Sequence, residues 1–163
     1  AACDGPTLDV GCGPGRMTSE LNASGAIALG IDVVPEAIEQ TRARGAQALL
    51  RDVFEHVPGI GRWQTVLLAD GNVGIGGDPV RLLRRVTDLL ADDGQVVVDV
   101  LAPGRRSSIR THRLQHGDQM SEPFPWAIVG VDQIAVIAEA AGLTVVRTEQ
   151  YAERWFAVLK KPG

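Results

Sequence analysis

One short stretch near the start of the chain, TLDVGCGPGR at positions 7–16, has the residue types of a ligand-binding loop. An apolar run leads into an acid, and three glycines then follow at alternate positions. Glycine is favoured where a Cβ would block a tight turn or the close approach of a ligand. The pattern predicts a buried strand that ends in a loop whose backbone lies against a bound molecule. The candidate site residues in this loop are Asp9, Gly11, Cys12, Gly13, Pro14, Gly15 and Arg16.

Three further segments each consist of an apolar run with an acid at or near its end. They are ALGID at 28–32, LLRDV at 49–53 and VLLAD at 66–70. The carboxyl ends of parallel strands form the crevice in which open α/β sheets bind ligands, and a carboxylate there can accept hydrogen bonds from ribose hydroxyls. This repetition adds six residues to the candidate site, namely Asp32, Val33, Asp52, Val53, Asp70 and Gly71.

The order of these motifs resembles that of the class I, seven-stranded S-adenosylmethionine-dependent methyltransferases, from about Thr7 to about Lys160. A dinucleotide-binding loop would need the spacing G-x-G-x-x-G, whose third glycine packs the helix against the strand. This chain has G-x-G-x-G instead, and Arg16 stands where the third glycine would be. The resemblance therefore implies that S-adenosylmethionine binds along the loop and leaves as S-adenosylhomocysteine.

For the methionine end of that cofactor, the resemblance implies that Asp9 holds the amino group, often through water. Arg16 would meet the carboxylate, while Asp70 and Gly71 would contact the methionine end and border the acceptor. The alternative for Asp9 is a cap on the glycine loop, and for Arg16 a solvated position in the first helical turn. Cys12 is interpreted as a small buried residue, because no base stands beside it.

For the nucleoside end, the resemblance implies that Asp32 binds both ribose hydroxyls, a bidentate role suited to a carboxylate. Asp52 would accept from the adenine amino group, with the backbone amide of Val53 near the ring. The alternatives are structural. Asp32 could be the N-cap of the next helix, and Asp52 a solvated loop acid.

The surrounding pattern predicts an α/β, Rossmann-like, doubly wound sheet of seven strands, mostly parallel, with an antiparallel last strand and helices on both faces. The predicted strands are 7–12, 26–32, 46–50, one within 62–70, 95–101, 143–151 and 154–160, and the predicted helices are 16–24, 35–45, 78–90 and 131–141. Residues 103–125 are expected to be irregular and to form an insertion on the acceptor side. Residues 1–163 are interpreted as a single domain.

Composition excludes several classes of function. The 163 residues are 45% hydrophobic and 22% charged with a net charge of −4, so no overall field favours nucleic acid or an anionic membrane. No apolar run could span a bilayer, and the two cysteines form neither a disulfide framework nor a metal set, which indicates a cytoplasmic protein. The chain starts at Ala1, without the helical segment that usually precedes the first strand in the family, which suggests a fragment or trimmed domain.

The segment RRSSIRTHRLQH at 105–116 carries four arginines and two histidines without an acid. We interpret it as recognising an anionic small-molecule acceptor, with His112 or His116 as a base, or alternatively as a solvated loop. Phe124, Pro125 and Trp126 form either a pocket wall or simple packing. The glycine-rich stretch 71–77, with Asn72 as its polar side chain, either shapes the acceptor pocket or is a flexible connection.

The sequence thus predicts a methyltransferase that moves the methyl group of S-adenosylmethionine to a small molecule by in-line displacement. It gives His112 and His116 only as candidates for a base and assigns no catalytic residue, it identifies no metal site, and it leaves the oligomeric state undetermined. Two alternatives stay open: a cofactor-binding partner subunit without turnover, and a nicotinamide-dependent oxidoreductase.

Overall fold

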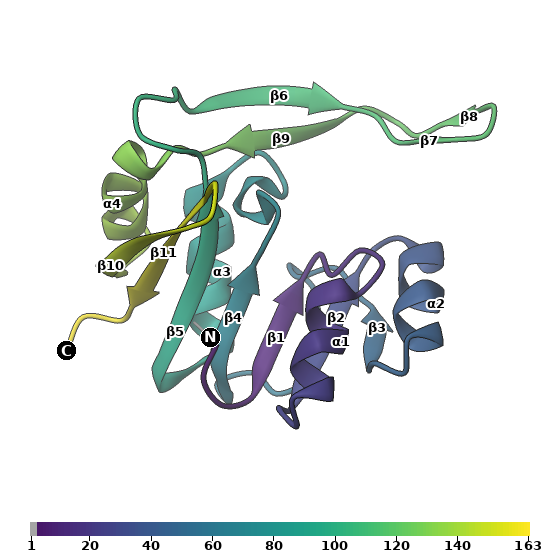
Figure 1. The fold of residues 1–163 in the computed structure, drawn as a ribbon. Coiled ribbons are helices and arrows are strands. Elements are labelled where there is room, and N and C mark those ends of the chain that lie inside the picture. Colours follow the sequence, from purple (N-terminus) through teal and green to yellow (C-terminus); the bar gives the residue numbers. More distant parts are fainter. Residues whose placement is uncertain (1–2) are drawn as a thin grey trace.

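Strands and helices alternate along most of the chain in the computed structural model, which describes residues 3–163 (Figure 1). The main sheet comprises β1 (Thr7–Val10), β2 (Ala28–Asp32), β3 (Ala48–Leu50), β4 (Trp63–Leu68), β5 (Leu90–Val100), β10 (Thr144–Tyr151) and β11 (Arg154–Lys160). The helices are α1 (Arg16–Ala23), α2 (Pro35–Ala43), α3 (Pro79–Leu89) and α4 (Val131–Ala140), with a short 3-10 helix, η1 (Asn72–Gly74).

The strand order is β10-β11-β5-β4-β1-β2-β3. The pairs β1–β2, β1–β4, β2–β3 and β4–β5 are parallel, whereas β11 is antiparallel to both β5 and β10. This topology confirms the predicted seven-stranded sheet with an antiparallel last strand. The carboxyl ends of β1 to β5 therefore share one edge, the upper edge in Figure 1, where ligands bind in sheets of this kind.

The larger part of the core lies between the sheet and the helices α3 and α4. Alternate strand residues such as Leu8, Val66 and Val96 are fully buried in this cluster, because successive side chains of a strand point to opposite faces. Helix α3 begins where the sequence predicts, since Asp78 accepts from the backbone N–H of Arg81 at 2.9 Å and a proline follows it. The opposite face carries a smaller cluster, which includes Leu67, Ala69, Val97 and Val158.

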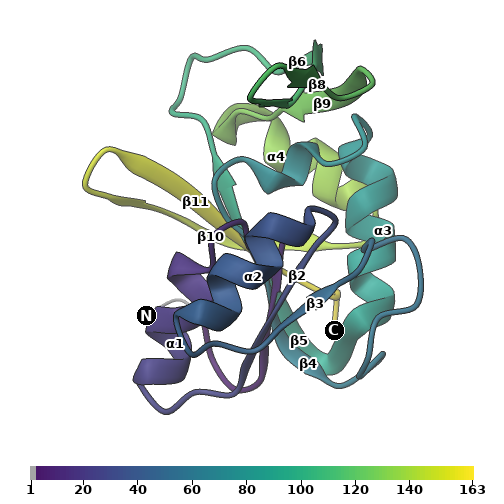
Figure 2. The same ribbon diagram turned by 90° about the vertical axis from the view of Figure 1, so that its right-hand side faces the viewer.

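Residues 103–125 are not irregular, so that prediction is wrong. The chain forms β6 (Ser108–His112), β7 (Gln115–His116), β8 (Gln119–Met120) and β9 (Phe124–Ile128), which pair as β6–β9 and β7–β8. We call residues 108–128 the arm, which lies above the carboxyl edge of the sheet in both ribbon views (Figures 1 and 2). All five residues of β6 are exposed, so no hydrophobic alternation marks the strand in the sequence.

A smaller difference concerns the start of β5. The sequence predicts a turn at Asp93-Gly94 and a strand from Gln95, but β5 already begins at Leu90, and its pairing with β4 shifts register between Trp63 and Thr65. Within residues 3–163, no helix has both the length and the apolar character needed to cross a membrane.

Candidate functional site

The glycine loop uses its three glycines for two different purposes. All three have positive φ angles, which L residues with a side chain rarely adopt. A Cβ at Gly11 would come within 2.7 Å of the Asn72 side chain, and one at Gly15 within 2.4 Å of Thr41. A Cβ at Gly13 would meet nothing within 4 Å. The outer two glycines are therefore required by internal packing, and Gly13 is the one that faces open space.

Asp9 lies beneath this loop and is only 1% exposed. Its Oδ2 accepts a hydrogen bond of 2.7 Å from the hydroxyl of Thr18 on α1. Burial raises the pKa of Asp9 to about 6, because the charged carboxylate loses hydration, and the negative charges of Asp70 and Asp32 add to this effect. Asp9 thus anchors α1 to β1, and its role toward a ligand stays a prediction.

Asp32 ends β2 and ties the loop to the next helix. Its Oδ2 accepts from the backbone N–H of Gly13 at 2.9 Å, and its Oδ1 from that of Val34 at 2.9 Å. The N-cap of α2 is Val34, without a side-chain cap bond, so Asp32 is not the helix cap of the structural alternative. Its bond to the Gly13 amide holds the carboxylate against the open position of the loop. Because each carboxylate oxygen has two lone pairs, both can still accept from a ligand.

A cavity of about 500 Å³, which we call the β2–β3 cavity, opens beside these strand ends. It is lined by Val33, Leu50, Arg51, Asp52, Glu55 and His56. Val33 is 63% exposed at its rim, and Oδ1 of Asp52 accepts from the backbone N–H of Phe54 at 2.9 Å. The side chain of Val53 is buried in the core instead.

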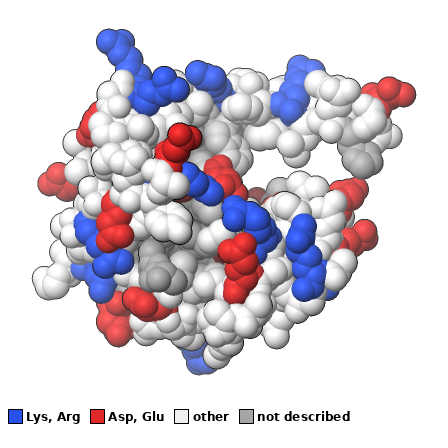
Figure 3. All heavy atoms as spheres, viewed as in Figure 1, with Lys and Arg blue, Asp and Glu red and all other residues white. Residues whose placement is uncertain are grey.

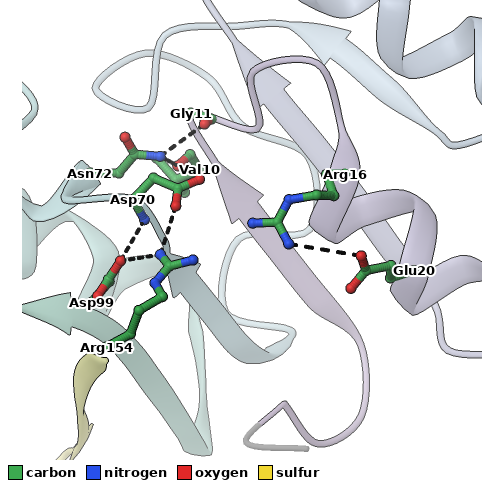
Figure 4. A network of polar contacts seen from close by, with 8 residues as sticks. All are labelled: Val10, Gly11, Arg16, Glu20, Asp70, Asn72, Asp99 and Arg154. Atoms are coloured by element: carbon green, nitrogen blue, oxygen red, sulfur yellow. Dashed lines mark hydrogen bonds and ion pairs between the residues drawn. The ribbon is translucent and has the colours of Figure 1, made fainter. Parts of the chain in front are cut away.

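The remaining residues of the glycine loop differ in exposure. Pro14 and Arg16 are exposed, and Nη1 of Arg16 lies 3.8 Å from Oε1 of Glu20 (Figure 4). Cys12 is buried with Ile38, and burial raises the pKa of its thiol to about 11. This thiol is therefore protonated at neutral pH, which agrees with its interpretation as a packing residue.

The side chain of Asn72 connects the segment after β4 to the glycine loop by hydrogen bonds. Its Nδ2 donates to the carbonyls of Val10 at 2.9 Å and Gly11 at 2.8 Å, and the residue is 8% exposed (Figure 4). Residues 72–74 form η1, so this part of the stretch 71–77 is a bonded, buried turn.

An arginine from the far end of the chain joins two acids at the ends of β4 and β5. Nη2 of Arg154, at the start of β11, donates to Oδ1 of Asp70 at 2.6 Å and to Oδ2 of Asp99 (Figure 4). Oδ2 of Asp99 also accepts from the backbone N–H of Asp70 at 3.0 Å, and Asp70 has a φ of 52°. The hydrogen bond to Asp99 is the main reason that the pKa of Arg154 rises above its ordinary value.

A second cavity of about 340 Å³, which we call the β4–β5 cavity, lies between this network and the arm. Its lining residues are Asp70, Gly71, Val73, Asp99, Val100, Leu101, His112, Trp126, Ala127, Ile128 and Val129. The structure thus brings the predicted residues Asp70 and Gly71 together with His112 and Trp126. The four arginines of 105–116 are exposed and none lines this cavity, and the side chain of His116 lies outside the described residues.

Sequence reasoning missed Thr18, Thr41, Asp99 and Arg154. A signal existed for Asp99, because it lies near the end of an apolar strand run, like the four acids that were selected. No sequence pattern marks Arg154, which reaches the site only because β11 pairs with β5.

The strand order and the loop after β1 define the fold of a class I methyltransferase. Residues 4–148 match the family described as a methyltransferase domain, which is most of the chain, so the protein belongs to the methyltransferase domain family. This finding confirms the resemblance seen in the sequence. No curated protein sequence matches the chain.

Solved structures share the fold at low sequence identity. A methyltransferase from Bacteroides fragilis, in complex with S-adenosyl-L-homocysteine, has a TM-score of 0.82 at 23% identity over 99% of this chain and 74% of its own. The CcbJ methyltransferase of Streptomyces caelestis has a TM-score of 0.73 at 16% identity over 97% and 84%. A 1,6-didemethyltoxoflavin-N1-methyltransferase from Burkholderia thailandensis has a TM-score of 0.69 at 19% identity over 98% and 72%.

Proposed function

We propose that this methyltransferase binds S-adenosylmethionine across the glycine loop and moves its methyl group to a small-molecule acceptor in the β4–β5 cavity. The observation that carries the proposal is the placement of two cavities on one sheet edge, with the open Gly13 position and the Asp32 carboxylate on the same edge. Family membership supports the reaction class.

The residues present fit the adenosyl group of this cofactor. The open direction at Gly13 leaves room for a ligand against the backbone, and Asp32 offers acceptor lone pairs to two ribose hydroxyls. Beyond Asp32, the β2–β3 cavity provides the apolar side chains of Val33 and Leu50 for a ring, and Asp52 an acceptor for an amino group.

At the other end of the cofactor, Asp9 and Arg16 are the proposed partners of the methionine amino and carboxylate groups. Asp9 is buried beneath the loop, so it would act through water. Arg16 is exposed and could bind the carboxylate once its ion pair with Glu20 is broken. Asp70 and Gly71 line the β4–β5 cavity, and this supports a proposed position beside the transferred methyl group.

The bound cofactor supplies a methyl group that its positive sulfur already activates. An acceptor atom in line with the carbon–sulfur bond would take this methyl group, and the electron pair of the broken bond would stay on sulfur. The acceptor's proton passes to a nearby carboxylate or to water. The chain's own task is then to position the acceptor and to exclude bulk water, and no dedicated base is required.

The anionic acceptor suggested by the arginine-rich segment receives no support from the cavity, whose described lining contains two acids and no lysine or arginine. A small-molecule acceptor, a cytoplasmic location and the lack of nucleic-acid or membrane partners remain predictions from composition and fold.

Parallel calorimetric titrations with S-adenosylmethionine, S-adenosylhomocysteine and NAD test the proposal. We expect affinities on the order of micromolar for the first two ligands, and no heat with NAD. A heat signal with NAD alone would favour the oxidoreductase alternative. Binding of both adenosyl ligands without product from a broad panel of acceptors would favour the partner-subunit alternative.

A further inference from the structure

The β4–β5 cavity is lined by two chemically different kinds of residue. The lining includes the apolar residues Val73, Val100 and Ile128 together with the carboxylates of Asp70 and Asp99. Its volume of about 340 Å³ is near the lower end of the range for small-molecule sites, which typically combine apolar walls with a few polar groups. The lining therefore fits a compact ligand with an apolar body and a polar group at one end.

The arm supplies an aromatic wall to this cavity. Trp126 and His112 line it, and both rings contact Phe124, with centroid distances of 6.3 Å from Phe124 to either ring. Trp126 is held in place by the segment after β4, since a Cβ on Gly74 would lie 2.6 Å from its Nε1 and Ile75 forms a β-bridge with it. A fixed aromatic surface of this kind favours a planar aromatic ligand.

The carboxylates of the cavity determine which polar group a bound ligand can carry. Arg154 bonds to Oδ1 of Asp70 and Oδ2 of Asp99, and among residues 3–163 nothing hydrogen-bonds to Oδ1 of Asp99. The Asp99 side chain is only 19% exposed. An ionised carboxylate can only accept hydrogen bonds, so a ligand in this cavity must offer N–H or O–H groups, and a carboxylate on the ligand would be repelled.

We propose that the β4–β5 cavity binds an aromatic molecule that carries an amine, with the ring against Trp126 and the amine N–H on Oδ1 of Asp99. The proposal rests on the proposed function, because it names the acceptor class of that same site. It assigns Asp99 and Trp126 as specificity-determining residues and excludes aromatic carboxylates as acceptors.

The test uses two probes of nearly the same shape and opposite charge, 2-phenylethylamine and phenylacetate. Each is titrated into the protein saturated with S-adenosylhomocysteine, with saturation-transfer NMR as the readout. We expect 2-phenylethylamine to bind about tenfold more tightly than phenylacetate. Equal affinities, tighter binding of phenylacetate, or binding of neither probe would overturn the proposal.

Two variants locate the effect. Asp99→Asn keeps the shape of the side chain but removes its charge, and should reduce the preference for the amine to about twofold. Trp126→Ala should weaken the binding of both probes by a similar factor of about tenfold, because it removes the aromatic surface and leaves the charge of Asp99 in place. The wild-type preference alone still tests the proposal if either variant fails to fold.

Ile109→Ala is the matched control on the same arm. Ile109 lies three positions before His112 on β6, so it points to the other face of the strand; it is 70% exposed and does not line the cavity. Its probe affinities should equal those of the wild type. The same probe titrations are repeated without S-adenosylhomocysteine to keep the two hypotheses apart. If the adenosyl ligand fails to bind in calorimetry, the proposed function is contradicted, and the preference between the two probes can still be measured.

Discussion

The two halves of the sheet edge hold their acidic side chains by different means. Around β1 and β2, Asp32 is fixed by backbone N–H groups, one of them only two residues away and the other 19 residues away. Around β4 and β5, Asp70 and Asp99 are fixed by a side chain 84 and 55 residues away. Asp32 is thus held by backbone groups close in sequence, whereas Asp70 and Asp99 depend on long-range charge pairing.

The largest effect should come from Gly15→Ala, which tests whether the glycine loop is held by packing. The new Cβ would clash with Thr41 at 2.4 Å in a backbone with a φ of 78°. Overpacking and the left-handed conformation together should lower the free energy of unfolding by about 3–5 kcal/mol.

Gly13→Ala is the control for that substitution, because its φ is also positive but its Cβ direction is open. We expect a loss of only about 1–2 kcal/mol from the backbone conformation. Urea denaturation of both variants gives the comparison, and similar losses would show that packing against Thr41 is not what requires Gly15.

The buried acid of the first half should make stability depend on pH. The pKa of Asp9 is about 6 in the folded chain, above its ordinary value, so between pH 4 and pH 6 the folded state retains a proton that the unfolded state has lost. Stability should therefore fall as pH rises through this window, by roughly 3 kcal/mol at most, and Asp9→Asn should remove that part of the slope. An unchanged slope would show that Asp9 titrates normally.

Asp32→Ala tests the polar contacts of the first half. Losing the carboxylate removes the proposed ribose acceptor and the bond to the Gly13 amide, so the affinity for S-adenosylhomocysteine should fall by about tenfold or more, as measured by calorimetry. Asp32→Asn keeps one acceptor oxygen and should lie between this variant and the wild type. Wild-type affinity in Asp32→Ala would remove Asp32 from the site.

Arg154→Gln tests the charge pairing of the second half and should have the smallest effect. It leaves Asp70 and Asp99 close together without a cation, and because Arg154 is half exposed, the loss of stability should be about 1 kcal/mol and should shrink in high salt. The affinity for S-adenosylhomocysteine should stay within about twofold of the wild type.

The matched control for Arg154→Gln is Arg147→Gln on β10. Nε of Arg147 forms an exposed ion pair with Glu149 at 2.8 Å, with no second acid in the pair. This substitution should cost no more than about 0.5 kcal/mol in chemical denaturation. Equal losses for the two arginines would mean that Arg154 is an ordinary surface ion pair.

The contrast also explains what the sequence could predict. The glycine loop, Asp32 and the seven strands are visible because short motifs and hydrophobic alternation report local structure. The arm escaped prediction because β6 is exposed throughout and has no buried face. Arg154 was not predicted because its contacts with Asp70 and Asp99 depend on the pairing of β11 with β5, which no local sequence pattern indicates.

The position of β11 between β5 and β10 also has a consequence for how the chain is made. A ribosome delivers β1, β2 and β3 before the other strands of the sheet, so that half can fold early from contacts close in sequence. The half around β4 and β5 must wait for Arg154–Lys160, because until β11 is inserted the edge of β5 stays open and β10 has no neighbour in the sheet. A nascent chain that stalls before these residues would expose a long apolar strand edge, which is the type of surface that promotes aggregation.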